Sequence, residues 1–197
     1  MLDAEHEMAY LREAVPLLKD YLLARDAAWQ LPGVVGDGRQ PYTMLTIGPL
    51  LFMLKRLKAR KLTAYELEEL GRFEEQIFQD KIHNENAWKK KAGQDMGSRL
   101  RLWQATWDEY QKDQQAVMAA YPTSIAQRVM LQLLWEEIEP AGLLAAPMQF
   151  TLQYLDVNLR MFFQPGDFIW EKVLQPAFPE ETYWYLYGTM FEKVKFK

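Results

Sequence analysis

The sequence contains no cysteine among its 197 residues, and this absence excludes several kinds of chemistry. Without a thiol the chain forms no disulfide, no thiolate zinc site and no iron–sulfur cluster, and it has no cysteine nucleophile. Serine is almost as scarce, because only Ser98 and Ser124 occur, and both lie where helix N-caps are expected. Neither serine belongs to a nucleophile elbow or to an obvious serine–histidine arrangement. The sequence therefore offers no recognisable cysteine or serine nucleophile.

Histidine is also rare, and the two histidines give little support for a metal site. His6 and His83 each follow an aspartate by three residues, Asp3 and Asp80 respectively. Helical bundles that hold two metal ions use Glu-x-x-His pairs whose side chains point into the core. On a helical projection His6 and His83 lie about 120° to 140° away from the apolar residues of their helices. We therefore expect no metal ion and no cofactor.

Long hydrophobic runs are missing as well. The most apolar early stretch, Met44 to Leu54, has 11 residues, whereas a membrane-spanning helix needs about 18 to 20. The first residues are acidic and amphipathic, and they show neither the basic start nor the apolar centre of a signal peptide. We expect a cytoplasmic protein without a membrane span.

What the sequence does contain is an abundance of apolar residues at helical spacing. Hydrophobic residues make up 49% of the chain, which is enough to form a core. They recur every three or four residues, and no segment shows the alternating pattern of a strand. Pro16 interrupts the first helix, which is either one kinked helix or two. The predicted helices cover approximately residues 3–30, 47–60, 63–91, 98–121, 123–138, 147–163, 168–174 and 180–194.

This pattern predicts an all-α, single-domain bundle of six or seven helices with a short, aromatic-rich helical C-terminal cap. The main bundle is expected to comprise residues 1–163, and the cap residues 164–197. The helix at 123–138 is apolar on most of its circumference, and such a helix is normally central. Thr63 and Glu66 match the capping box that begins a helix.

Two glycine-containing stretches are interpreted as connections between helices. Residues 31–43, "LPGVVGDGRQPYT", contain three glycines but lack the Gly-Lys-Ser/Thr ending of a phosphate-binding loop. They also follow a predicted helix, whereas a dinucleotide-binding loop follows a strand. We interpret this stretch as an unusually long interhelical loop whose role stays open. Residues 92–98, "AGQDMGS", are expected to separate two helices.

Two clusters of basic residues raise the question of nucleic-acid binding. Residues 55–61 contain five cations, and residues 89–101 contain a second cluster. The stretch between them is acidic and predicted to be helical, so that the two clusters lie at opposite ends of it. Because they then form no continuous basic surface, we do not expect nucleic acid to be a partner.

The aromatic C-terminal cap supplies the first functional hypothesis. On the predicted last helix, Tyr185 points away from the apolar face and Trp184 lies at its margin. Exposed Trp and Tyr are enriched at protein interfaces, and Trp170 and Phe178 belong to the same aromatic region. We therefore interpret the chain as a cytosolic protein-interaction module, such as an adaptor, regulatory subunit or assembly factor. Its expected partner is another protein chain, either a second copy or a different protein. The alternative, that these aromatics only fill the end of the bundle, stays open.

The second hypothesis is a helical-bundle enzyme or small-molecule binder. Glu74 projects towards the apolar side of its helix, and a buried carboxylate can serve as a general acid or base. The pocket would be lined by aromatic residues, as many ligand sites are: Trp103, Trp107, Tyr110 and Trp135. In the competing interpretation, Glu74 lies at the boundary of the core with its carboxylate in water, or it pairs with an arginine.

Overall fold

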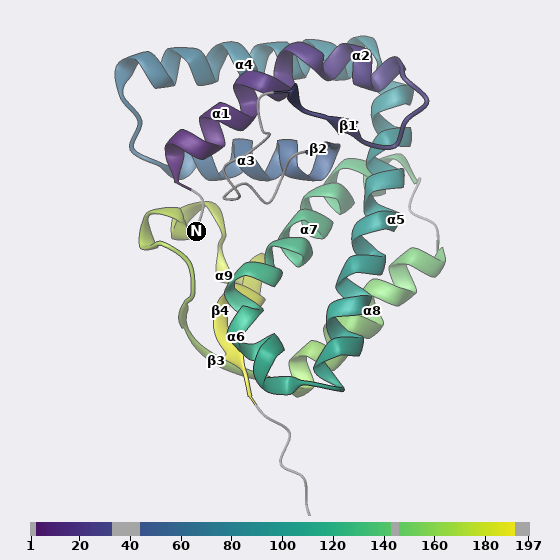
Figure 1. Ribbon diagram of the computed structural model, residues 1–197, viewed down its shortest axis with the longest axis vertical. Helices are drawn as coiled ribbons and strands as arrows, with labels where there is room; N and C mark the ends of the chain where they lie inside the picture. Colours follow the sequence, from purple (N-terminus) through teal and green to yellow (C-terminus); the bar gives the residue numbers. More distant parts are fainter. Residues whose placement is uncertain (1–2, 33–43, 143–145, 192–197) are drawn as a thin grey trace, which may run out of the picture.

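The computed structural model describes residues 3–32, 44–142 and 146–191, and helices dominate these ranges (Figure 1). Two small antiparallel sheets accompany them, pairing β1 (Trp29–Gln30) with β2 (Met44–Leu45) and β3 (Phe163–Phe168) with β4 (Tyr187–Met190). The predicted all-α class is therefore confirmed. The nine α-helices in the described ranges are α1 Ala4–Ala14, α2 Leu18–Leu23, α3 Ile47–Ala59, α4 Ala64–His83, α5 Glu85–Tyr110, α6 Gln114–Ser124, α7 Ala126–Ile138, α8 Ala146–Met161 and α9 Glu180–Tyr183.

The first helix is interrupted at Pro16, as the sequence predicts, but its helical structure ends earlier than expected. Asp3 caps α1 by accepting the backbone N–H of His6 at 2.9 Å. A 3₁₀ turn that contains Pro16 joins α1 to α2. Proline suits the start of this turn because a backbone N–H there would have no acceptor within the turn. Helix α2 ends at Leu23, and the following chain pairs in the β1–β2 sheet. Most of the predicted loop at 31–43 lies outside the described residues.

Helices α4 and α5 meet at Asn84, and not at the glycine-containing stretch where the sequence predicted a break. The capping box of Thr63 and Glu66 is present at the start of α4. Helix α5 then runs through residues 92–98 without interruption. A glycine inside a helix costs roughly 0.5–1 kcal/mol, but Ala92, Asp95 and Met96 of this stretch are buried in the core. This packing outweighs the cost of the glycines.

Neither serine is a helix N-cap, which corrects the expectation from the sequence. Ser98 lies inside α5, where its hydroxyl donates to the carbonyl of Gln94 at 3.1 Å. Ser124 ends α6, and its hydroxyl donates to the carbonyl of Tyr121 at 3.4 Å. The N-cap of α6 is Asp113, whose carboxylate accepts a backbone N–H at 3.0 Å. The chain therefore breaks at 111–113, within the helix predicted over 98–121.

The C-terminal cap is only partly helical. The predicted helix at 180–194 shrinks to the single turn of α9, followed by a 3₁₀ turn at Trp184–Leu186 and by β4; residues 192–194 lie outside the described residues. The predicted helix at 168–174 is replaced by a 3₁₀ helix at Lys172–Ala177. Strand β4 pairs with β3 at Gly188, whose φ of +149° is rarely adopted by other residues. A Cβ there would lie 2.1 Å from the carbonyl oxygen of Gln164, so the strands require glycine at this point.

Helix α7 occupies the centre of the fold, as its all-round apolar sequence predicts. It packs against both α5 and α3. In Figure 1, α1 to α4 form the upper part of the molecule, α5 and α7 descend from it, and α8 and the β3–β4 sheet lie at the lower end. The buried residues of α7 are Ala126, Arg128, Val129, Met130, Leu131, Leu133, Leu134 and Ile138.

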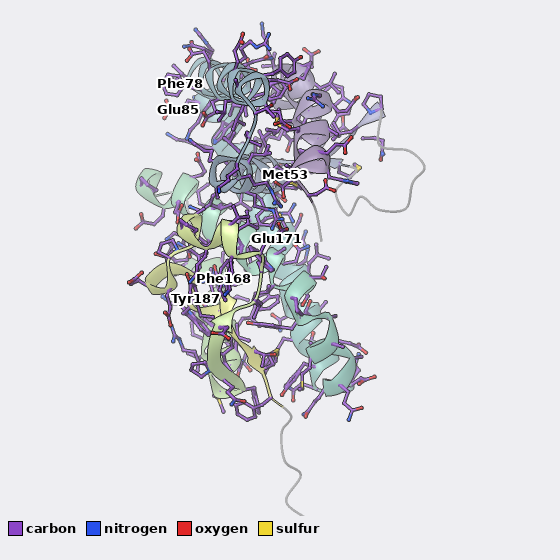
Figure 2. All side chains as sticks on the ribbon, turned by 90° about the vertical axis from the view of Figure 1, so that its left-hand side faces the viewer. Met53, Phe78, Glu85, Phe168, Glu171 and Tyr187 are labelled. Carbon is purple, nitrogen blue, oxygen red and sulfur yellow. The ribbon has the colours of Figure 1, made fainter. Side chains whose placement is uncertain are left out.

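Aromatic side chains attach the cap to the helices. Phe168 of β3 and Tyr187 of β4 lie side by side in the cap (Figure 2), with ring centroids 5.2 Å apart. Three further aromatic side chains donate hydrogen bonds of 2.7 Å to backbone carbonyls across the boundary between helices and cap. These bonds run from Tyr110 to Phe191, from Tyr121 to Tyr185 and from Trp170 to Pro122.

Candidate functional site

The four aromatic residues predicted to bind a partner lie in the cap, and most of their surface is buried. Phe178 and Tyr185 are fully buried, and Trp170 nearly so. The prediction that Tyr185 points outward is wrong, because the chain at this point forms a 3₁₀ turn instead of continuing as a helix. Trp184 is partly exposed, and the Arg160 guanidinium of α8 covers its ring at 3.8 Å from the centroid. Partner binding through these residues stays a prediction.

The residues of the predicted aromatic pocket come together only in part. Trp103, Trp107 and Tyr110 line a cavity of about 10 Å³ between α5, α6 and α8. That volume corresponds to roughly one water molecule, so this cluster is core packing. Glu74 and Trp135 do not line the cavity. Glu74 instead lies on α4 and forms an ion pair with Lys58, a lysine and not an arginine.

Two arginines of the first basic cluster bind a buried carboxylate, Glu7, which is not among the site residues predicted from the sequence. Glu7 is 0% exposed; it accepts from Arg56 Nε at 2.6 Å and from Arg60 Nε at 2.7 Å. Arg60 also donates to Glu171 of the cap at 2.8 Å, and this contact holds the pKa of the Glu171 carboxyl below its ordinary value. Figure 2 shows Glu171 below α3, where the upper helices meet the cap. The available signal was that Glu7 lies four residues before Leu11, on the apolar side of α1.

Two cations of the second basic cluster are also buried and bonded inside the molecule. Arg99 is buried beside Asp95, with Nε 3.0 Å from Oδ1. Asp95 Oδ2 accepts the backbone N–H of Gly48 at 2.6 Å, so the pair fixes the beginning of α3. Lys91 is buried too, and it donates to the backbone carbonyls of Ala24 and Asp26. Both clusters therefore contribute cations to internal structure, and the expectation that nucleic acid is not a partner stays a prediction.

The outer face of α8 is the most continuous exposed apolar feature on one helix. Its four large residues follow one another at intervals of four, three and four, which places them on one side of the helix. At 100° per residue they lie roughly opposite the buried Leu152, Leu155 and Leu159. The residues of this outer stripe and their exposed fractions are Phe150 (71%), Tyr154 (52%), Val157 (59%) and Met161 (62%).

The surroundings of the outer stripe carry little charge. The exposed polar residues of α8 include Gln149 and Gln153, and Arg160 is the charged member among its exposed residues. The one acidic residue of α8, Asp156, accepts two hydrogen bonds from Arg128 of α7 at 2.7 and 2.8 Å. Helix faces that are in contact with water usually carry several charged residues. The composition of this face is instead typical of a surface that packs against another helix.

A groove on another part of the molecule combines apolar and charged side chains. It has a volume of about 520 Å³ and lies between α3, α7 and the 3₁₀ helix at Lys172–Ala177. Its two lysines come from α3 and its two glutamates from α7. The lining residues are Leu51, Leu54, Lys55, Lys58, Ala59, Leu133, Glu136, Glu137, Pro176 and Ala177.

Helix α4 borders this groove through two ion pairs. Lys58 of α3 pairs with Glu74, and Glu137 of α7 pairs with Lys81 at 2.6 Å. Glu137 also accepts a hydrogen bond from Trp88 Nε1 at 2.8 Å. These contacts satisfy one lysine and one glutamate of the groove.

The described residues contain no group of three or more His, Asp or Glu side chains placed to hold a metal ion. Among the helices in the described ranges, none combines the length and apolarity required to cross a membrane. No protein-family model, curated protein or solved structure matches the chain, so any functional conclusion rests on the geometry of these surfaces.

Proposed function

We propose that the chain is a helical protein-interaction module that binds a helix of another protein chain through the outer stripe of α8. The observation that carries this proposal is the exposure of Phe150, Tyr154, Val157 and Met161 on a face with almost no charge. A contiguous exposed apolar patch on a folded protein commonly marks an interaction site. The spacing of four, three and four residues matches the seam that one helix offers to another in a coiled coil.

The way α8 is held supports this role. Its inner residues are buried against the molecule, and Asp156 is bound by Arg128 of α7. The Arg160 side chain packs on Trp184 of the cap. The helix is thus fixed by its other sides, and binding a partner helix through the stripe requires no rearrangement of these contacts. A preorganised surface loses little conformational entropy on binding.

The test is to introduce a charge at the centre of the stripe. In Val157→Glu, association with the partner chain should weaken by at least about tenfold, because the carboxylate would be buried in an apolar contact. The matched control is Gln149→Glu, which adds the same charge to an exposed position about 100° away on the same helix. It should leave association unchanged within about twofold.

Sedimentation equilibrium measures self-association, and native mass spectrometry of the protein purified from its own cells detects a stoichiometric second chain. Circular dichroism establishes that both variants are folded. The proposal fails if the wild-type protein is monomeric and free of a second chain in both measurements. It fails equally if an observed association responds in the same way to Val157→Glu and to Gln149→Glu.

A further inference from the structure

The groove between α3, α7 and the 3₁₀ helix at Lys172–Ala177 has the size of a small-molecule site. Its volume of about 520 Å³ falls within the roughly 300–1,000 Å³ typical of ligand-binding clefts. Apolar side chains make up more than half of its lining, which favours an apolar portion of a ligand. These side chains are Leu51, Leu54, Ala59, Leu133, Pro176 and Ala177.

Lys55 is the side chain of the groove whose charge is poorly compensated. Its ammonium group lies 5.1 Å from the ring centroid of Tyr183 and 5.6 Å from that of Phe178. Among the described residues it forms no ion pair, in contrast to Lys58 in the same groove. Burial lowers the pKa of the Lys55 amine, and Lys58 lowers it further, while Glu136 raises it without pairing with it. A half-buried ammonium of this kind is stabilised by an anion placed beside it.

The opposite wall limits the charge of that anion. Glu136 of α7 lines the same groove and, unlike Glu137, forms no ion pair among the described residues, so its carboxylate repels a group with two negative charges, such as a phosphate dianion. The second lysine is already bound to Glu74, so it adds little attraction. A single negative charge beside Lys55 fits this arrangement best.

We propose that this groove binds a small monocarboxylate with an apolar tail, with the carboxylate against Lys55 and the tail against the leucines of α3 and α7. The site is separate from the outer stripe of α8 and does not depend on the proposed interaction function. A cation at one end of an apolar cleft fixes both the orientation and the chemical class of what binds.

Decanoate is a suitable probe, and its binding can be measured by isothermal titration calorimetry. Lys55→Met keeps an unbranched apolar side chain but removes the charge, and it should weaken decanoate binding by at least about tenfold. Lys58→Met is the matched control, because Lys58 lies in the same groove but is neutralised by Glu74. It should change the affinity by less than about threefold.

A second probe separates the charge from the tail. Decan-1-ol has the same tail without a carboxylate, so the wild-type protein should bind it more weakly than it binds decanoate. The affinity for decan-1-ol should be the same in Lys55→Met as in the wild-type protein. Val157→Glu, which tests the stripe of α8, should bind decanoate with the wild-type affinity.

Three results would overturn the proposal: no saturable binding of decanoate to the wild-type protein, equal affinity of the wild type and Lys55→Met, or equal losses in Lys55→Met and Lys58→Met. Circular dichroism of the lysine variants excludes unfolding as the reason for a loss.

Discussion

At the scale of single residues, two glutamates that project towards the apolar side of their helices differ in burial. Glu74 attracts attention in the sequence because it projects to the apolar side of its helix, yet it lies at the surface and pairs with Lys58. Glu7 is the carboxylate that is fully buried, between Arg56 and Arg60. Helical projection gives the direction of a side chain but not the neighbour that it meets. Identifying Glu7 as part of a network requires knowing that α1 packs on α3.

The network around Glu7 gives a prediction for stability. In Glu7→Gln, Arg60 keeps its ion pair with Glu171, but the buried Arg56 loses the carboxylate that lies 2.6 Å from its Nε. Removing one partner from a buried ion pair costs about 3–5 kcal/mol, so the free energy of unfolding should fall by about that amount. Urea denaturation followed by circular dichroism measures the change.

The control for this prediction is the exposed ion pair between Arg12 and Glu69. It has two hydrogen bonds of 2.8 and 2.6 Å, but the Arg12 side chain is 45% exposed. Glu69→Gln should therefore change the free energy of unfolding by about 1 kcal/mol or less. Equal losses in Glu7→Gln and Glu69→Gln would contradict the role assigned to burial.

At the scale of elements, the local signals for helix starts give mixed results, because two hold whereas the expected caps Ser98 and Ser124 are not N-caps. Asp3 and the Thr63–Glu66 capping box begin helices where expected, because these signals depend on neighbouring residues. The break expected at 92–98 is absent, since burial of that stretch is decided by distant parts of the chain. The same limitation applies to the cap, where pairing of β4 with β3 converts a predicted helix into a strand.

Helix α4 is predicted to open more readily than the rest of the bundle. Of its twenty residues only Leu70 and Ile77 are buried, whereas most of the thirteen residues of α7 are. Phe78 points outward from α4 in Figure 2 and is 54% exposed. Because few apolar contacts hold it, α4 can unfold locally while the core stays intact.

Hydrogen exchange followed by mass spectrometry tests this difference. Backbone amides in the middle of α4 should exchange at least about tenfold faster than those in the middle of α7. Equal protection of the two helices would show that α4 opens only when the whole molecule unfolds.

At the scale of the whole molecule, buried tyrosines link stability to alkaline pH. Burial raises the pKa of Tyr10, Tyr121 and Tyr185 above the ordinary value of 10.0. Below that pH the folded and unfolded states both keep these protons, so the stabilisation is fully present. Above it the unfolded state releases protons that the folded state retains, and the free energy of unfolding falls as the pH rises.

The expected outcome is one cooperative alkaline transition above about pH 10, in which tyrosinate absorbance from these residues rises as the helical circular dichroism is lost. In Tyr121→Phe the absorbance change of this transition should be smaller. If the absorbance of all ten tyrosines appeared while the helical signal was unchanged, the buried tyrosines would not be coupled to unfolding.

At the same scale, the helical class follows from the spacing of apolar residues along the chain. The central place of α7 follows from the apolar residues on most of its circumference. The outer stripe of α8 is also present in the sequence as a second apolar row, at positions 150, 154, 157 and 161. Its significance becomes clear only when the opposite row is seen to be buried. The groove beside Lys55 could not be inferred, because its walls come from three segments far apart in the chain.

The attachment of the cap to the helices has a consequence for the newly made chain. Synthesis on the ribosome proceeds from the N-terminus, so α5, α6 and α7 are complete before residues 163–191 have been made. Until then Tyr121 lacks the Tyr185 carbonyl, and Phe52 of α3 lacks the Trp170 ring that packs against it at 5.7 Å. Apolar surface that is exposed during synthesis promotes aggregation. The aromatic cap therefore closes the molecule only after α7 has been made, and in the interval before the cap emerges chaperones would protect this apolar surface of the nascent chain.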